Sequence, residues 1–172
     1  MADSERKGKG LFNVEYLIVL VLFIIFSTYF TFRMMEQKPA YTAEVQREIF
    51  RAESYRLSEM LVDDAGEPAN WQTLAEGSIK RIGLSDETKN VTNLVSEAKL
   101  QAMKTICIVN KEYAKVKALV GGQHDFSLVR IGSNGVPETV CWPGATGDVK
   151  ASITRFVAFS TGDYGKMILQ MW

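Results

Sequence analysis

The sequence has 172 residues, with 20 Lys and Arg against 20 Asp and Glu, so the formal net charge is +0. This balance excludes the basic surface of a typical nucleic-acid-binding protein, and it also excludes an acidic tail protein. One histidine and two cysteines exclude sites built from several imidazoles or many thiolates. The length suits one ordinary domain, although the apolar residues gather near the N-terminus.

A predominantly apolar segment, residues 11–32, follows a polar N-terminus of ten residues. As a helix it is about 33 Å long, and the hydrocarbon core of a bilayer is about 30 Å thick. A helix in a soluble core normally keeps one polar face, and this segment has none. No small-residue cleavage site follows it, so we expect a membrane helix that stays attached to the chain.

Glu15 is the one charged residue inside this segment. A carboxylate among lipid tails is costly and usually marks a function, although Glu15 lies only about 6 Å from the segment's start and could reach the headgroups. The basic leader ending in Lys9 and Gly10, the apolar run and Glu15 together resemble a type IV prepilin signal, as in archaeal pilin-like proteins. The resemblance implies cleavage after Gly10, which makes Leu11 the first mature residue and Glu15 the fifth.

The resemblance also implies a function and a location. It predicts a structural subunit, major or minor, of an archaeal type IV pilus-like surface filament. The implied partners are other copies of the chain or related pilins, a prepilin peptidase and an assembly platform in the membrane. The precursor is expected in the cytoplasmic membrane with its N-terminus in the cytoplasm, and the assembled protein at the cell surface.

In such a filament the carboxylate of Glu15 is expected to face the new amine of Leu11 on another subunit, which would offset the burial of both charges. Leu11 and Asn13 depart from the Gln and the small hydroxyl residue usual in one archaeal branch, so the processing peptidase stays open. The alternative function is a single-pass membrane-anchored extracellular binding module.

Residues 40–62 have apolar side chains at helical spacing and charges on the other face. The expected ion pairs are Glu44 with Arg47, Glu48 with Arg51, and Glu53 with Arg56. The segment is either a separate soluble helix or the continuation of one long helix bent at Pro39. Gly66 and Pro68 end it, and the Asp63-Asp64 pair lacks the ligand spacing of a calcium loop, so no metal site is expected.

Three short motifs beyond the helix extend the resemblance to archaeal pilin-like proteins. They are a Gly66-x-Pro68-x-x-Trp71 turn, an Ile82-Gly83-Leu84 segment, and Lys99-Leu100 within a helix expected over 96–103. Ser96 is the expected N-cap of that helix. A further helix is expected over 110–120, ended by two glycines.

The remainder of the chain predicts strands over 125–131, 139–142, 151–160 and 166–172, with an Asn-Gly hairpin between the first two. Helices first and strands second indicate an α+β fold with a four-strand antiparallel sheet. The expected organisation is a leader over 1–10, a transmembrane and filament-core helix with an amphipathic extension over 11–62, and an extracellular head over 63–172.

No nucleophile or phosphate-binding motif occurs, and His124-Asp125 is the only imidazole–carboxylate pairing in sequence, so neither an enzyme nor a cofactor is expected. Cys107 and Cys141 form a disulfide in an oxidising location, or else remain as two buried thiols. Asn90 begins the only N-x-[ST] sequon and is the candidate glycosylation site.

Overall fold

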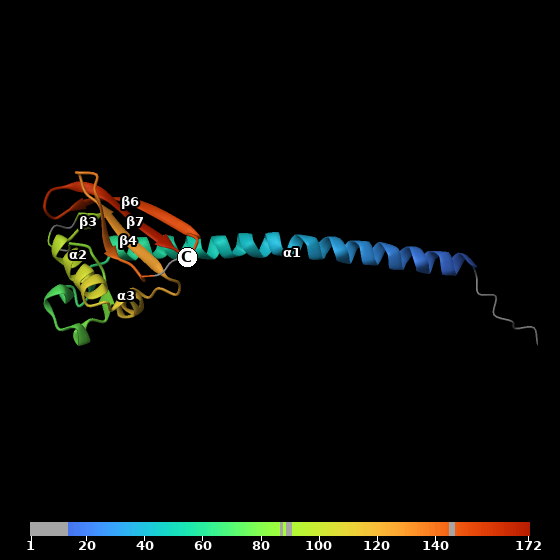
Figure 1. Cartoon of the computed structure of the whole chain (residues 1–172), viewed down its shortest axis with the longest axis horizontal. Coiled ribbons are helices and arrows are strands. Elements are labelled where there is room, and N and C mark those ends of the chain that lie inside the picture. Colours follow the sequence, from blue (N-terminus) through green and yellow to red (C-terminus); the bar gives the residue numbers. More distant parts are fainter. Residues whose placement is uncertain (1–13, 87, 89–90, 145–146) are drawn as a thin grey trace, which may run out of the picture. The chain divides into compact units, whose positions relative to one another are not determined.

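The computed structural model describes residues 14–86, 88, 91–144 and 147–172. Contacts divide the chain into two units, Met1–Glu44 and Val45–Trp172. The first helix, α1 (Val14–Asp63), contributes to both units, and Pro39 lies within its bounds (Figure 1). The second unit contains all other helices and strands that the structure describes.

The second unit is a mixed α+β domain built on a curled five-stranded sheet with the order β3-β6-β7-β4-β5. The strands are β3 (Leu94–Val95), β4 (Phe126–Ile131), β5 (Pro137–Cys141), β6 (Ala151–Phe159) and β7 (Tyr164–Met171). The four longer strands pair antiparallel and match the four predicted segments.

The expectation of a four-strand, purely antiparallel sheet is nevertheless wrong. β3 pairs in parallel with β6, through Leu94 with Ala158 and Val95 with Phe159. A strand of two residues is too short to show the alternation of apolar and polar side chains by which strands are predicted.

Two helices of the head, α2 (Glu97–Lys104) and α3 (Tyr113–Val120), fall close to their predicted ranges. The π-helix η4 (Thr105–Val109), which lies between them, was not predicted. Ser96 holds the N-cap position of α2 but makes no side-chain capping bond, and the Glu97 N–H donates instead to Ser160 Oγ at 3.0 Å. α3 ends at Gly121, whose φ of 70° is the left-handed conformation that glycine adopts readily.

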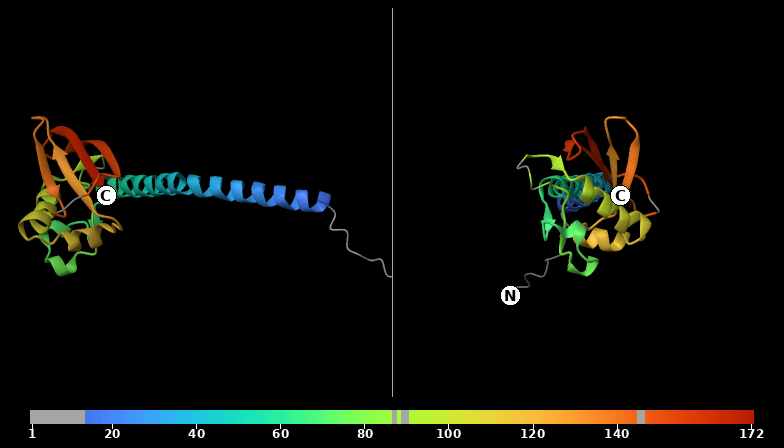
Figure 2. Two further views of the ribbon diagram at one scale, coloured as in Figure 1. Left: turned by 45° about the vertical axis from the view of Figure 1, so that its right-hand side comes forward. Right: turned by 90° about the vertical axis from the view of Figure 1, so that its left-hand side faces the viewer.

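Short elements connect α1 to the main sheet. β1 (Gly66–Glu67) and β2 (Arg81–Ile82) form a two-stranded sheet, and two 3-10 turns lie between them, η1 (Trp71–Thr73) and η2 (Glu76–Ser78). Figure 2 shows the main sheet and the helices α2 and α3 gathered around the C-terminal end of α1.

The two faces of the main sheet have different surroundings. On β6 and β7 the odd-numbered residues Val157, Phe159, Met167 and Leu169 are buried in the core, together with Leu57 and Leu61 of α1. The even-numbered residues of these strands are mostly exposed. Residues 45–63 of α1 and helix α2 therefore cover the inner face, and the outer face is open.

Candidate functional site

The apolar segment of α1 has no protein cover in the part of the chain that the structure describes. All residues over 14–36 are exposed, including aromatic side chains such as Phe23, Phe26 and Phe30. By length and composition the helix could cross a membrane. A helix that is apolar all round requires lipid or other helices around it.

Glu15 lies in the first turn of α1 and is exposed. The residues predicted to act with it, Lys9, Gly10 and Leu11, lie outside the described residues. A carboxylate in the first turn interacts favourably with the partial positive charge of the helix N-terminus.

The three short motifs of the head meet just after the end of α1. Trp71 is fully buried, and its Nε1 donates to the carbonyl of Gly83 at 2.8 Å. Lys99 is only 4% exposed, and its Nζ donates to the carbonyls of Ala65 and Ser85, each at 2.8 Å. Residues far apart in sequence therefore satisfy the backbone groups of one turn region, as buried polar groups require.

Two glycines allow these segments to pack closely. Gly66 has φ +86°, and a Cβ there would lie 2.7 Å from Trp71 Cδ1. A Cβ on Gly83 would lie 2.5 Å from Gly66 N and would also clash with the carbonyl of Asp64. Both positions therefore require glycine for steric reasons, and Gly66 also for its backbone conformation.

His124 pairs with Glu53 of α1 rather than with its sequence neighbour Asp125. Glu53 Oε2 lies 2.5 Å from His124 Nδ1, and Oε1 accepts from the backbone N–H groups of Gln123 and His124 at 2.6 and 3.2 Å. Burial raises the pKa of Glu53, but these hydrogen bonds outweigh it and hold the pKa below its usual value. Asp125 binds Lys117 Nζ at 2.8 Å instead.

The expected pairing of Glu53 with Arg56 is therefore wrong, whereas Arg51 and Glu48 do pair at 3.3 Å. Arg56 Nη2 donates to the carbonyl of Gly121 at 3.0 Å. The side chains of Glu53 and Arg56 on α1 thus both bind the loop after α3. We call these contacts the clasp, and their role is structural. No nucleophilic side chain is hydrogen-bonded to His124 among the described residues.

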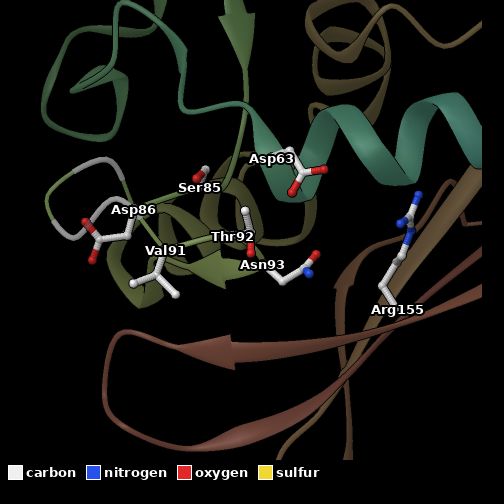
Figure 3. A pocket seen from close by; sticks show the side chains of 7 residues that line it. All are labelled: Asp63, Ser85, Asp86, Val91, Thr92, Asn93 and Arg155. Carbon is white, nitrogen blue, oxygen red and sulfur yellow. The ribbon is translucent and has the colours of Figure 1, made fainter.

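A polar cavity of about 420 Å³ lies beside the end of α1 (Figure 3). Asp63 from α1, Asn93 from the loop before β3 and Arg155 from β6 face the same space in Figure 3. Arg155 Nε donates to Ser58 Oγ at 3.2 Å, and its guanidinium lies over the Tyr55 ring, 4.7 Å from the centroid. The remaining Arg155 Nη2 is buried without a hydrogen-bond partner in the described structure.

The lining of this cavity carries both signs of charge, the carboxylates of Asp63 and Asp86 and the guanidinium of Arg155. No group of three His, Cys, Asp or Glu residues that could hold a metal ion occurs among the described residues. The carboxylate of Asp63 and the guanidinium of Arg155 would suit a ligand carrying both charges. Sequence analysis did not find Arg155, because its neighbours in space come from α1 and from a loop, far away along the chain.

A disulfide joins Cys107 of η4 to Cys141 at the end of β5, with a Cα–Cα distance of 5.3 Å. Both cysteines are buried, and the bond links the helical layer to an edge strand of the sheet. The candidate glycosylation site, Asn90, lies outside the described residues.

No model of a known protein family, no curated protein and no solved structure matches this chain. Its function must therefore be inferred from its own residues.

Proposed function

We propose that this chain is a structural subunit, major or minor, of an archaeal type IV pilus-like filament. The observation that carries the proposal is the combination on α1 of an apolar segment without protein cover and Glu15 in its first turn. The resemblance of residues 6–32 to a prepilin signal supports it. The precursor would reside in the cytoplasmic membrane and would lose residues 1–10 before assembly.

The physical reasoning concerns what surrounds the helix. In the bilayer, lipid tails cover the apolar side chains over 14–32. Outside the bilayer only neighbouring apolar helices can do so, and because the helix is apolar on every side it needs neighbours on every side. A helical bundle of many copies supplies them, whereas a dimer covers only one side.

In such a bundle, Glu15 would determine how neighbouring helices are aligned along their axes. A carboxylate buried in an apolar bundle is costly unless an opposite charge lies beside it. Cleavage after Gly10 would create that charge as the amine of Leu11, at the start of a neighbouring helix. A simple membrane tether would need neither the cleavage nor the carboxylate.

The test replaces Glu15 with Gln, which keeps the size and removes the charge. The matched control is Glu36→Gln on the same helix, where the carboxylate is exposed and lies 3.5 Å from Arg33. Cells expressing each variant are sheared, and filament protein is compared with protein retained in the membrane. Intact mass of both fractions reports processing, since removal of ten of the 172 residues leaves 162.

We expect the wild type and Glu36→Gln to yield filaments of the 162-residue form, and Glu15→Gln to be inserted and processed but largely retained in the membrane. Normal filaments from Glu15→Gln would refute the charge pairing. Wild-type protein that keeps its leader and never leaves the membrane would refute the filament role.

That last result would favour the second candidate function, a single-pass anchored binding module. The specific observation in its favour is that the open outer face of the head carries a groove between two tryptophans.

A further inference from the structure

A groove of about 380 Å³ crosses the outer face of the sheet on β4, β5 and β7. Its volume falls within the range of small-molecule sites. Because residues 45–63 of α1 cover the inner face, the groove lies on the opposite side of the sheet from the end of α1. Its lining consists of Ser127, Val129, Thr139, Trp142, Val149, Gln170 and Trp172.

Two of the three tryptophans of the chain flank this groove. Trp71, in contrast, is fully buried in the core. Trp142 is 45% exposed, although burying so large an apolar side chain would normally stabilise a fold. Trp142 and Trp172 therefore leave flat aromatic surface available to a ligand.

Apart from the tryptophans, the groove is lined by two valines, Val129 and Val149, and by three uncharged polar residues. Ser127, Thr139 and Gln170 contribute two hydroxyls and an amide, and these groups both donate and accept hydrogen bonds. None of the seven lining residues carries a charge. A charged ligand would lose its hydration here without gaining a counter-charge, so the lining selects a neutral one.

Trp172 also has an unused donor. Its Nε1 is shielded from solvent and has no hydrogen-bond partner in the described structure. A buried donor left without an acceptor is unfavourable, and native structures rarely contain one. A ligand that brings an oxygen within reach would satisfy this donor, so the Trp172 N–H resonance serves as a reporter of binding.

We propose that this groove binds a neutral saccharide. A sugar ring has an apolar C–H face that packs on an indole. Its hydroxyls both donate and accept hydrogen bonds, as the hydroxyls and the amide that line the groove do. A proline-rich peptide would also pack on tryptophan, but its prolines offer carbonyl acceptors and no backbone N–H donors. The polar groups of the groove thus match a sugar better than a proline-rich peptide. This inference does not depend on filament assembly.

The experiment uses the full chain in a detergent without a sugar headgroup, with its indole N–H groups labelled with ¹⁵N. The probes are neutral oligosaccharides of glucose, galactose, mannose and N-acetylglucosamine, and a proline decapeptide. We expect at least one saccharide to shift the Trp142 and Trp172 indole resonances. The Trp71 resonance is the internal control, because its N–H is bound to the Gly83 carbonyl inside the core.

Two variants assign the binding to the groove. Trp142→Ala should weaken saccharide binding about tenfold or more, as loss of one stacking partner would. Tyr164→Ala removes an aromatic that is 75% exposed on the same face but outside the groove, and it should bind as the wild type does. Three results would overturn the proposal: no shift with any saccharide at millimolar concentration, shifts with the proline peptide alone, or unchanged affinity in Trp142→Ala.

Discussion

Gly83 is the position at which one added methyl group should harm the head most. The Cβ of alanine there would lie 2.5 Å from Gly66 N and 2.6 Å from Asp64 C, whereas ordinary contact begins near 3.4 Å. The atoms that it meets all belong to the backbone and cannot rotate away. The carbonyl oxygen of Asp64 lies closer still, so the segments must separate by more than about 0.9 Å, a shift that the close packing of a protein interior resists.

The cost follows from the hydrogen bonds that such a shift would break. Leu84 N donates to Leu61 O at 2.8 Å, Ser85 N donates to Asp64 O at 3.0 Å, and Trp71 Nε1 donates to Gly83 O at 2.8 Å. Leaving one buried partner unsatisfied costs about 1–3 kcal/mol. Loss of any two of these bonds would cost about 2–6 kcal/mol, so Gly83→Ala should lower the free energy of unfolding by about 2–6 kcal/mol.

Urea unfolding of the full chain in detergent, followed by near-UV circular dichroism and tryptophan fluorescence, measures this effect. Gly77→Ala is the matched control, since a Cβ there meets nothing within 4 Å. It should change the free energy of unfolding by no more than about 0.5 kcal/mol. If Gly83→Ala stays within about 1 kcal/mol of this control, the close packing inferred around Gly83 is wrong.

Two further predictions concern the links within the head. Replacing both Cys107 and Cys141 with Ala should lower the free energy of unfolding by roughly 3–4 kcal/mol, because the cross-link restricts the unfolded chain over a separation of 34 residues. If Cys107 and Cys141 of the non-reduced wild type react with a thiol label, the disulfide on which this prediction rests is absent. Glu53→Gln should lower the free energy of unfolding by about 1.5–3 kcal/mol at pH 7. Because the pKa of Glu53 is lowered in the folded state, its contribution is present above the ordinary value near 4.5 and is lost as the pH falls through the folded pKa. The difference between wild type and variant should therefore shrink in acid, and a difference independent of pH would refute the clasp.

The sequence predicted those elements whose signal is local. The apolar run and the amphipathic spacing over 40–62 predicted both parts of α1 as helix, although they left open whether the two parts are continuous, and the strand predicted over 151–160 is β6. The Asn-Gly signal likewise falls in the connection between β4 and β5, with Gly135 at φ 72°. Each of these patterns is complete within one short segment, so no tertiary information was needed.

Features that depend on distant partners could not be predicted in this way. The i,i+3 rule assigned Glu53 to Arg56, but a loop 71 residues away offers Glu53 an imidazole and two backbone N–H groups. β3 depends on distant partners, pairing with β6 through two residues and bridging to Ser85 through Val95. The groove between Trp142 and Trp172 was missed because the residues that form it come from three strands and from segments outside them.

The packing at the end of α1 bears on how such a subunit could assemble. Leu57 and Leu61 are fully buried in the head, and the Leu61 carbonyl accepts from Leu84 N, so the last turns of α1 complete the core of the head rather than tether it. Burying two leucine side chains contributes about 3–6 kcal/mol, a large amount beside the roughly 5–15 kcal/mol by which an ordinary domain is stable. These turns cannot be withdrawn from the head without unfolding it. In the proposed filament, the helix before these buried turns is therefore the part that is free to pack against other copies, and Glu15 lies within it.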